Sequence, residues 1–246
     1  IGIKHFIGCA NGTDALEIAI KSLEINGNDD EIIIQGNTYI ATCLGAMNNN
    51  IKVILCDIEP NTHMIDINML KNKISKKTRA IIVVHLYGLV PDMEQISNIC
   101  KENNLFLIED CAQAHGAKWN GQNVGTFGDL SCFSFYPGKN LGAYGDAGGI
   151  GTNSDELNEK MRKIGNLGCK VKYHHELIGR NSRLDTIQAG VLDVKLKHLE
   201  EWNKARRKNA KCYDLHLADI EHLQVPILNE KCLPVYHLYV IKTKFR

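Results

Sequence analysis

The chain has 246 residues, of which 44% are hydrophobic and 23% charged, and its formal net charge is +1. This composition indicates a globular protein with one large domain, or with one domain and part of another. The balanced charge gives no reason to expect binding to nucleic acid or to a membrane, and no apolar run approaches the roughly 18 residues of a membrane-spanning helix.

Nine cysteines are spread along the chain, and no two of them form a C-x-x-C pair. An odd number of scattered cysteines indicates reduced thiols in a cytoplasmic protein rather than a disulfide framework. Neither an H-E-x-x-H pattern nor a cysteine and histidine cluster with zinc spacing occurs, so we expect no metal site. The start of the chain has no signal-peptide pattern.

The first half of the chain alternates short apolar runs with amphipathic stretches. After Asn11, apolar residues at helical spacing predict a helix, with Thr13 or Asp14 as its N-cap and Glu17 completing a capping box with Asp14. A short apolar segment at 5–9 precedes this helix. The other expected elements are strands at 31–34, 52–56, 80–85, 105–108 and 130–135, and helices at 39–47, 66–74 and 93–102.

Strands rich in Ile, Val and Leu are typical of a sheet that is covered on both faces. Their alternation with helices predicts an α/β fold, in which a mostly parallel central sheet is flanked by helices. In such sheets, ligands bind beyond the carboxyl ends of the strands. The residues expected at that edge are Asp57, His85, Asp110 and the segment that follows Phe135.

The second half of the chain has a different pattern. The expected elements are an amphipathic helix at 153–167, a polar loop at 168–182, a long helix at 184–215 and a strand at 235–246. We expect a large α/β domain at 1–200, followed at 201–246 by a linking helix and the beginning of a smaller C-terminal α+β domain. Both ends have the appearance of cut ends, so we expect a piece of a longer protein.

Two groups of residues in the first half have the pattern of a ligand site. Gly12, Thr13 and Asp14 stand at a helix start, where backbone N–H groups and a hydroxyl bind anions, although a plain N-cap has the same pattern. Asp110 ends an apolar strand, where a carboxylate can pair with a buried cation such as a protonated pyridine nitrogen. A helix cap or a structural ion pair is the alternative for Asp110.

A third group runs from Ser134 to Lys139. Ser134 is a candidate phosphate ligand, and Lys139 stands between aromatic residues and glycines. A lysine in apolar surroundings has a lowered pKa and can attack an aldehyde cofactor, whereas a solvated loop lysine is the alternative. The glycines that follow do not form G-x-G-x-x-G, which disfavours a dinucleotide fold. His85 and His115, near the same edge, have the pattern of lone structural histidines or of residues behind the site.

The three groups together have the chain order of a pyridoxal-phosphate enzyme of the aspartate aminotransferase fold. In detail, the sequence resembles the DegT/DnrJ/EryC1/StrS family of pyridoxal-phosphate-dependent nucleotide-sugar aminotransferases, which have fold type I. The matching stretches are A-N-G-T-D-A-L at 10–16, N-T-Y-I-A-T at 37–42, V-H-L-Y-G at 84–88, I-E-D-C-A-Q-A-H-G-A at 108–117, F-S-F-Y-P-G-K-N-L-G-A-Y-G-D-A-G-G at 133–149 and N-S-R-L-D-T-I-Q-A at 181–189.

The resemblance implies a role for each residue that matches a family motif. Lys139 is the Schiff-base lysine and the proton carrier, and Asp110 is the partner of the pyridine nitrogen. Gln113 contacts the phenolic oxygen of the cofactor, and Tyr39 stacks on its ring. The implied phosphate ligands are Gly12, Thr13, Asp14, Ser134 and, from a neighbouring subunit, Asn181. The last of these implies a homodimer with shared active sites.

The implied reaction transfers the amino group of L-glutamate through the cofactor to a keto sugar. The acceptor is a dTDP- or UDP-linked 4-keto- or 3-keto-6-deoxyhexose, and the product is an amino-dideoxy sugar for a glycan such as a polysaccharide or an O-antigen. The Y-H-H run at 173–175 is similar to members that act at C3, but members that act at C4 share most other motifs, so both remain open. The candidate substrate residues are Tyr136, Tyr173, His174 and His175.

Two alternatives fit the same motifs less well. Sugar 3-dehydratases that use the same cofactor have histidine in place of the lysine, so Lys139 argues against them. An inactive regulatory homologue is the other alternative, and intact Lys139, Asp110 and Gln113 argue against it.

Overall fold

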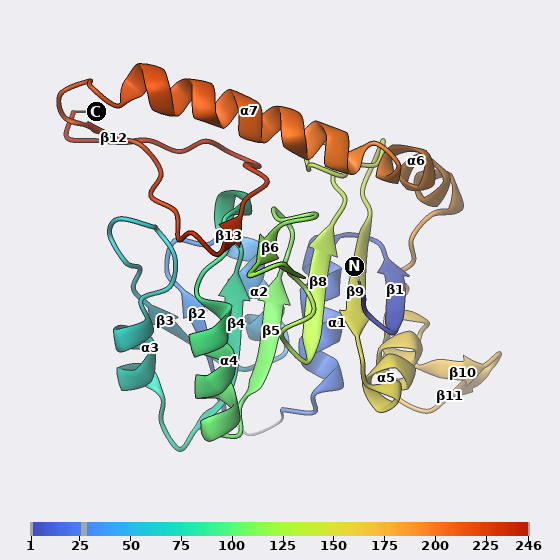
Figure 1. Ribbon diagram of the computed structural model, residues 1–246. Coiled ribbons are helices and arrows are strands. Elements are labelled where there is room, and N and C mark those ends of the chain that lie inside the picture. The colour runs from blue at the N-terminus through green and yellow to red at the C-terminus, as the bar shows by residue number, and fades with distance from the viewer. Residues whose placement is uncertain (1, 26–28, 246) are drawn as a thin grey trace.

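The computed structural model describes residues 2–25 and 29–245. Its centre is a seven-stranded sheet with the strand order β1-β9-β8-β5-β4-β2-β3 (Figure 1). Adjacent strands from β8 to β3 run parallel, whereas β9 runs opposite to both its neighbours, β8 and β1. The predicted α/β fold with a mostly parallel sheet is therefore confirmed. The strands are β1 (His5–Cys9), β2 (Glu31–Gln35), β3 (Lys52–Cys56), β4 (Thr78–Val84), β5 (Phe106–Asp110), β8 (Leu130–Ser134) and β9 (Gly148–Thr152).

Side chains of the central strands alternate between two hydrophobic cores. Ile32 and Ile34 of β2 face the core that α1, α2 and α5 cover, and Ile33 faces the core that α3 and α4 cover. All three side chains are fully buried, and burying one of this size contributes about 1.5–3 kcal/mol. Because helices cover both faces, a ligand reaches the strands at their ends. The helices are α1 (Gly12–Ser22), α2 (Ile40–Met47), α3 (Ile67–Lys73), α4 (Met93–Glu102) and α5 (Asp155–Gly165).

Helix α1 begins at Gly12, two or three residues earlier than predicted. Asn11 is its N-cap, and the Oδ1 atom of Asn11 accepts a hydrogen bond from the backbone N–H of Asp14 at 2.8 Å. Asn is among the preferred N-cap residues. Thr13 and Asp14 already lie inside the first turn, so the predicted caps and the capping box with Glu17 are wrong.

The sequence pattern does not predict β9, whose sequence is G-G-I-G-T. Every residue of this strand is buried, and its glycines allow close packing against β1 and the residues before it. A Cβ atom on Gly151 would lie 2.6 Å from a side-chain carbon of Ile3, and one on Gly149 would overlap the ring of Phe6. Glycines that local chemistry assigns to turns therefore serve inter-strand packing here.

The long helix predicted at 184–215 is two helices, α6 (Thr186–Leu196) and α7 (Leu199–Leu217). Neither glycine nor proline marks the break, so the sequence predicts one continuous helix. Leu192 of α6 is buried in one of the two cores, and Leu199 of α7 packs against the same core. The break lets α7 cross the end of the sheet, as Figure 1 shows.

The C-terminal residues contact the rest of the chain through isolated backbone hydrogen bonds and two-residue strands, and the strand predicted at 235–246 does not form within the described residues. Val235 donates its N–H to the carbonyl of Gly88 at 2.9 Å, and Leu238 donates to the carbonyl of Tyr87 at 3.3 Å. Helix α7 crosses the expected domain boundary, and the division at residue 200 stays a prediction. The short elements are η1 (Leu86–Gly88), β6 (Lys118–Trp119), β7 (Gln122–Asn123), β12 (Leu223–Gln224), β13 (Cys232–Leu233) and β14 (Lys242–Thr243).

The polar loop predicted at 168–182 contains a hairpin of β10 (Cys169–Val171) and β11 (His174–His175). Figure 1 shows this hairpin at the corner of the molecule beside α5, away from α7.

The nine cysteines are unpaired, and burial raises the pKa of the enclosed Cys111 and Cys132 thiols. Among the helices of the described residues, none has both the length and the apolar character to cross a membrane. The expected cytoplasmic location stays a prediction.

Candidate active site

A cavity of about 630 Å³ lies between the carboxyl ends of β4, β5 and β8 and the N-terminus of α1. Its volume is within the range of small-molecule sites. Side chains from five separate segments of the sequence line this cavity. Nine of the predicted site residues are among them: Gly12, Thr13, Asp14, Tyr39, Asp110, Gln113, Ser134, Tyr136 and Lys139.

Gly12 allows the N-terminus of α1 to lie against the end of β8. A Cβ atom at position 12 would lie 2.6 Å from the Cβ atom of Ser134 and 3.2 Å from its Oγ atom, so a side chain there would push the helix and the strand apart. With glycine, the first helical turn and the Ser134 hydroxyl share one wall of the cavity. A helix N-terminus of this kind binds anions through its backbone N–H groups.

Asp14 lines the same wall, but its polar groups already have partners. Its N–H donates to Asn11, and its Oδ1 atom accepts a hydrogen bond from Nη1 of Arg180 at 3.0 Å. Arg180 also pairs with Glu17, so it compensates two carboxylates near the helix N-terminus. The predicted anion site therefore rests on Gly12, Thr13 and Ser134, while a direct role for Asp14 stays a prediction.

Asp110 is the last residue of β5, and only 6% of it is exposed. Its Oδ2 atom accepts a hydrogen bond from the Thr42 hydroxyl at 2.9 Å, and its Oδ1 atom accepts one from the N–H of Ala112 at 3.1 Å. Burial raises the pKa of this carboxyl group, although these hydrogen bonds and the positive charge of Lys139 oppose the rise. A buried carboxylate of this kind is ready to pair with a cation that enters the cavity.

Lys139 follows a tight turn in which its N–H donates to the carbonyl of Tyr136 at 2.8 Å. Gly142 is required beside this turn, because a Cβ atom there would overlap the carbonyl of Pro137. Burial lowers the pKa of Lys139, as its apolar surroundings predict, and the Asp110 carboxylate opposes this shift. A lowered pKa leaves more of the amine neutral, and the neutral amine is the nucleophile and the base.

Gln113 is oriented by the backbone of η1. Its Oε1 atom accepts a hydrogen bond from the N–H of Tyr87 at 2.6 Å, so its NH₂ group is left to donate to a ligand. Tyr87 has φ 62° and ψ 3°, in the left-handed region that non-glycine residues rarely occupy. Backbone of this kind is often found at binding sites, where the surrounding structure holds it.

Two tyrosines line the outer part of the cavity and are exposed. Tyr39 stands at the N-cap position of α2 with 71% of its surface exposed, and Tyr136 is 58% exposed. Aromatic side chains with this exposure are suited to cover a planar ligand.

The remaining predicted site residues lie outside the cavity of their own chain. Tyr173, His174 and His175 are exposed on the hairpin of β10 and β11, and Asn181 is exposed where it bridges to Asn166. Asp57, expected at the carboxyl edge, is exposed at the end of the edge strand β3 and does not line the cavity.

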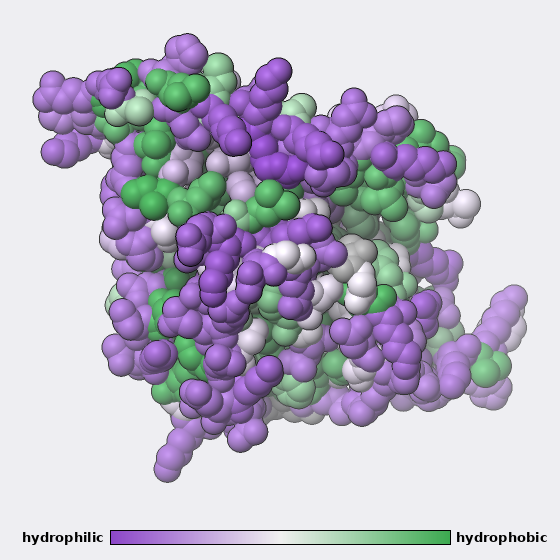
Figure 2. Space-filling view, in the orientation of Figure 1, coloured by the Kyte–Doolittle hydropathy of each residue, from purple (hydrophilic) through white to green (hydrophobic). Residues whose placement is uncertain are grey.

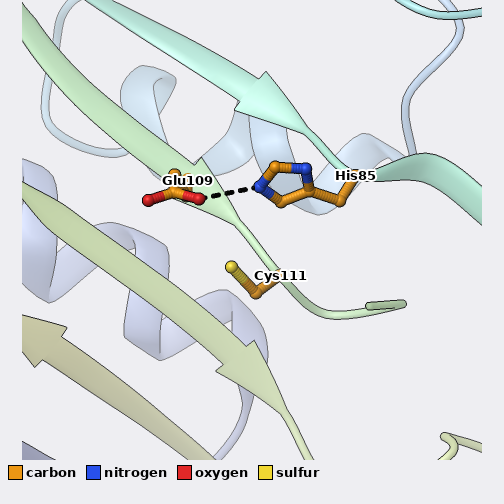
Figure 3. A group of neighbouring side chains, drawn as sticks. All are labelled: His85, Glu109 and Cys111. Carbon is orange, nitrogen blue, oxygen red and sulfur yellow. Dashed lines mark hydrogen bonds and ion pairs between the residues drawn. The ribbon is translucent and has the colours of Figure 1, made fainter. Parts of the chain in front are cut away.

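His85, Glu109 and Cys111 form a buried cluster (Figure 3), and the last two flank Asp110 in the sequence. The Glu109 carboxylate accepts a hydrogen bond from Nε2 of His85 at 2.9 Å and three more from backbone N–H groups of the loop at 125–128. Burial raises the pKa of the Cys111 thiol, which disfavours the thiolate form. The four hydrogen bonds that the Glu109 carboxylate accepts give this cluster a structural role, because they join His85 and the loop at 125–128 to β5.

Sequence reasoning did not identify Asn11 and Thr42, which both belong to the site. Thr42 is fully buried and lies one turn after Tyr39 on α2, where the i and i+3 positions share a face. That spacing is the signal that identifies it. Asn11 stands directly before Gly12, where N-cap preference alone identifies it.

The model of the DegT/DnrJ/EryC1/StrS aminotransferase family matches residues 1–246. A dTDP-3-amino-3,6-dideoxy-alpha-D-galactopyranose transaminase from Aneurinibacillus thermoaerophilus is 46% identical over 245 residues, which are 100% of this chain and 67% of that protein. A protein of Geobacillus stearothermophilus described as a pleiotropic regulatory protein is 44% identical over 245 residues, which are 99% of this chain and 66% of that protein.

Among solved structures, DesV of S. venezuelae in complex with a ketimine intermediate has a TM-score of 0.96 to this chain. The two sequences are 38% identical, and the match covers 99% of this chain and 66% of that chain. The chain thus spans about two thirds of the length of the curated relatives that it matches.

Proposed function

Because the chain belongs to the DegT/DnrJ/EryC1/StrS aminotransferase family, we propose that it binds pyridoxal 5′-phosphate in the cavity and moves an amino group from L-glutamate to a nucleotide-linked keto sugar. The observation that carries this proposal is the arrangement of one cavity. It places Lys139, Asp110, Gln113 and Ser134 around a common space, although they come from two separate parts of the sequence.

The residues of the cavity fit this cofactor. Asp110 is a buried carboxylate that accepts two hydrogen bonds but forms no ion pair within the described residues, which suits a protonated pyridine nitrogen. Gln113 has its carbonyl oxygen occupied and its NH₂ group left for a phenolic oxygen. Gly12, Thr13 and Ser134 supply the anion-binding wall for the phosphate group.

When bound, pyridoxal phosphate supplies an electron sink for the carbon that loses a proton. Asp110 holds the proton on the pyridine nitrogen, and Thr42 holds Asp110 in place. Lys139 takes and returns a proton at its Nζ atom, and its lowered pKa keeps a fraction of the amine neutral for this task. Tyr39 covers the ring and excludes water from it.

A homodimer with shared active sites is part of the proposal. Asn181 and the residues at 173–175 are exposed and lie outside the cavity of their own chain, so they are free to reach a second copy. Helix α6 leaves large apolar side chains uncovered, and Figure 2 shows hydrophobic atoms at its position in the upper right. The exposed fractions are 74% for Ile187, 61% for Val194 and 55% for Leu196. We infer that a second copy of the chain covers this face, because closed twofold dimers are the commonest assemblies.

For the acceptor we propose a dTDP- or UDP-linked 3-keto-6-deoxyhexose. The 46% identical relative is named for a 3-amino-3,6-dideoxy sugar, which supports amination at C3. The product is then an amino-dideoxy sugar for glycan synthesis in the cytoplasm. Amination at C4 is the competing outcome.

The test is a product assay with the full-length protein. L-Glutamate is supplied with dTDP- and UDP-linked 3-keto and 4-keto sugars, and the products are identified by mass spectrometry and NMR. A 3-amino sugar together with 2-oxoglutarate supports the proposal, and a 4-amino sugar corrects its regiochemistry. A protein that neither takes up pyridoxal phosphate nor releases 2-oxoglutarate overturns it.

A regulatory protein without catalysis is the second candidate, because one relative carries a regulatory description. The half-reaction separates the two functions. A purely regulatory protein forms no 2-oxoglutarate from glutamate at any cofactor concentration, whereas an aminotransferase forms about one equivalent per bound cofactor in the absence of an acceptor.

A further inference from the structure

The residue after Lys139 is the most enclosed residue of its turn. Only 5% of Asn140 is exposed, whereas the three residues before Lys139 are exposed to solvent. Every polar atom of the Asn140 side chain has a partner. Its Nδ2 atom donates to Oδ1 of Asn203 and to the carbonyl of Val235, both at 3.0 Å, and its Oδ1 atom accepts from Nδ1 of His237 at 3.1 Å.

Asn203 extends this network from the second turn of α7. It is fully buried, and its Nδ2 atom donates to the carbonyl of His115 at 2.8 Å. Asn is a poor residue for a helix interior, and a buried amide is costly unless it is hydrogen-bonded. The position is therefore explained by its two partners, one in the Lys139 turn and one in the loop that follows Asp110.

The same C-terminal residues also hold the turn that orients Gln113. Val235 and Leu238 donate backbone hydrogen bonds to Gly88 and Tyr87, and Tyr87 donates to Gln113 at 2.6 Å. A Cβ atom on Gly88 would lie 2.9 Å from the backbone nitrogen of His237, so the two segments are in close contact. Residues 235–238 therefore touch the supports of two cavity residues, Gln113 and Lys139.

We propose that Asn140 is a positioning residue for Lys139, and that Asn203 and residues 235–237 act on Lys139 through it. The proposal rests on the proposed function, because it assigns Asn140 a role toward the reactive lysine. A lysine side chain has four flexible bonds, so its amine reaches one place reproducibly only when the backbone that carries it is fixed. The Lys139 backbone is held on one side by its own hydrogen bond to Tyr136 and on the other by Asn140.

A positioning role and a purely structural role have different consequences far from the cavity. Asn203 lies 63 residues from Asn140 in sequence and does not line the cavity. Replacing it nevertheless removes one of the three hydrogen-bond partners of Asn140. A structural amide pair affects the stability of the fold. A positioning pair also affects the rate at which the cofactor is fixed on Lys139 and the pH midpoint of its absorption.

The experiment uses the full-length protein loaded with pyridoxal phosphate, and it compares Asn140→Leu, Asn203→Leu and their double variant with the unsubstituted protein. Three quantities are measured: the melting temperature, the rate at which borohydride fixes the cofactor on the Lys139 peptide, and the pH midpoint of the visible absorption of the cofactor. The matched control is Asn49→Leu. Asn49 also donates two hydrogen bonds from Nδ2, to the carbonyls of Glu17 and Gly45, and does not line the cavity.

We expect Asn140→Leu to slow fixation on Lys139 by roughly 10–100-fold, because a displacement of about 1 Å costs on that order. We expect both single variants to shift the pH midpoint of the cofactor absorption in the same direction, and Asn203→Leu to shift it by the smaller amount. The double variant leaves the carbonyls of His115 and Val235 and Nδ1 of His237 unpaired, as many groups as Asn140→Leu leaves. We therefore expect its melting temperature to be close to that of Asn140→Leu, and its pH midpoint not to be restored. Asn49→Leu lowers the melting temperature alone.

Failure of the inference and failure of the proposed function are distinguishable. If the unsubstituted protein fixes no cofactor on Lys139, the proposed function fails. If it does, and the Asn140 and Asn203 variants differ from Asn49→Leu only in melting temperature, the positioning role is overturned. Asn140→Ser, which is smaller and keeps a hydroxyl, replaces Asn140→Leu in the same comparison if the leucine variant does not fold.

Discussion

The inner wall of the cavity and the hairpin of β10 and β11 are built in opposite ways. Asp110 on the inner wall and Asn140, which directly follows Lys139, are buried and hydrogen-bonded to residues from other elements. On the hairpin, Tyr173 is 79% exposed, and the residues of β11 are exposed as well. Under the proposed function, one chain assembles most of the cofactor residues, and Asn181 and the hairpin of a second copy complete the site.

Replacing the lysine of the inner wall has the largest expected effect. We expect Lys139→Ala to slow the conversion of glutamate to 2-oxoglutarate by at least roughly 10²–10⁴-fold, because a positioned proton-transfer group contributes that much. Single-turnover kinetics of the glutamate half-reaction measure it. The control is Lys101→Ala, on the exposed side of α4. Equal rates for the two variants would show that the inner wall is not catalytic.

The next largest effect is expected at the buried carboxylate. Asp110→Asn keeps the shape of the side chain but removes the charge that stabilises a protonated pyridine nitrogen. We expect the same half-reaction to slow by roughly 10²–10³-fold, as when one preorganised electrostatic group is removed. Asp92→Asn, at the N-cap of α4, is the matched control and retains capping ability. A loss at Asp110 no larger than at Asp92 contradicts the assignment.

The dependence on a second copy is tested by mixing subunits. In a hybrid dimer of a Lys139→Ala subunit and an Asn181→Ala subunit, shared sites place both defects in one site and leave the other site intact. We expect the hybrid to recover about half the activity of the unsubstituted dimer, although each parent dimer is impaired. Activity of the hybrid equal to the mean of its parents means that each site is made by one chain.

A smaller effect is expected on the pH at which Lys139 reacts. The negative charge of Asp110 raises the pKa of Lys139 against the effect of burial, so Asp110→Asn lowers that pKa further. In cofactor-free protein, the acylation rate of Lys139 then reaches half its maximum at a lower pH, which peptide mapping measures. His115 and His237 do not titrate at the neutral to alkaline pH of this measurement, since burial lowers their pKa values to about 3 and about 4. An unchanged or higher midpoint means that the two side chains do not interact.

The smallest effect concerns stability in acid. His115 is 3% exposed, and burial lowers its pKa to about 3, against about 6.5 in an unfolded chain. Between these values the unfolded state binds a proton that the folded state does not, so the free energy of unfolding falls as the pH falls. We expect His115→Phe to remove up to about 1.4 kcal/mol per pH unit of that fall. Urea unfolding between pH 6 and pH 4 measures it, and an unchanged slope contradicts the assignment.

The sequence predicts the parts of the fold that local pattern determines. Strands such as β2 and β4 are continuous apolar runs between turn residues, so their burial on two faces is visible in the sequence. Strand β9 and the break between α6 and α7 are not visible in this way. Strand β9 depends on close packing of its glycines against Phe6. The break between α6 and α7 depends on the packing of Leu192 and Leu199 on the same core. Neither contact leaves a signal in the local sequence.

The site shows the same division. The local pattern identifies Lys139 and Asp110, the family resemblance adds Gln113, and the cavity contains all three. The pairing of Asn140 with Asn203 joins residues that are 63 positions apart, and nothing in either neighbourhood predicts it. Contacts of this kind form only in the folded protein, whereas the reactive groups lie in short motifs that can be recognised from the local sequence.

The most direct test of the account is to locate the cofactor on the chain. Protein loaded with pyridoxal phosphate is reduced with borohydride and digested, and the modified peptide is sequenced by mass spectrometry. The account predicts one stoichiometric modification, on the Nζ atom of Lys139, and its absence after prior incubation with glutamate. A modification on another lysine, or none at all, would contradict the assignment of the inner wall as the catalytic half of the site.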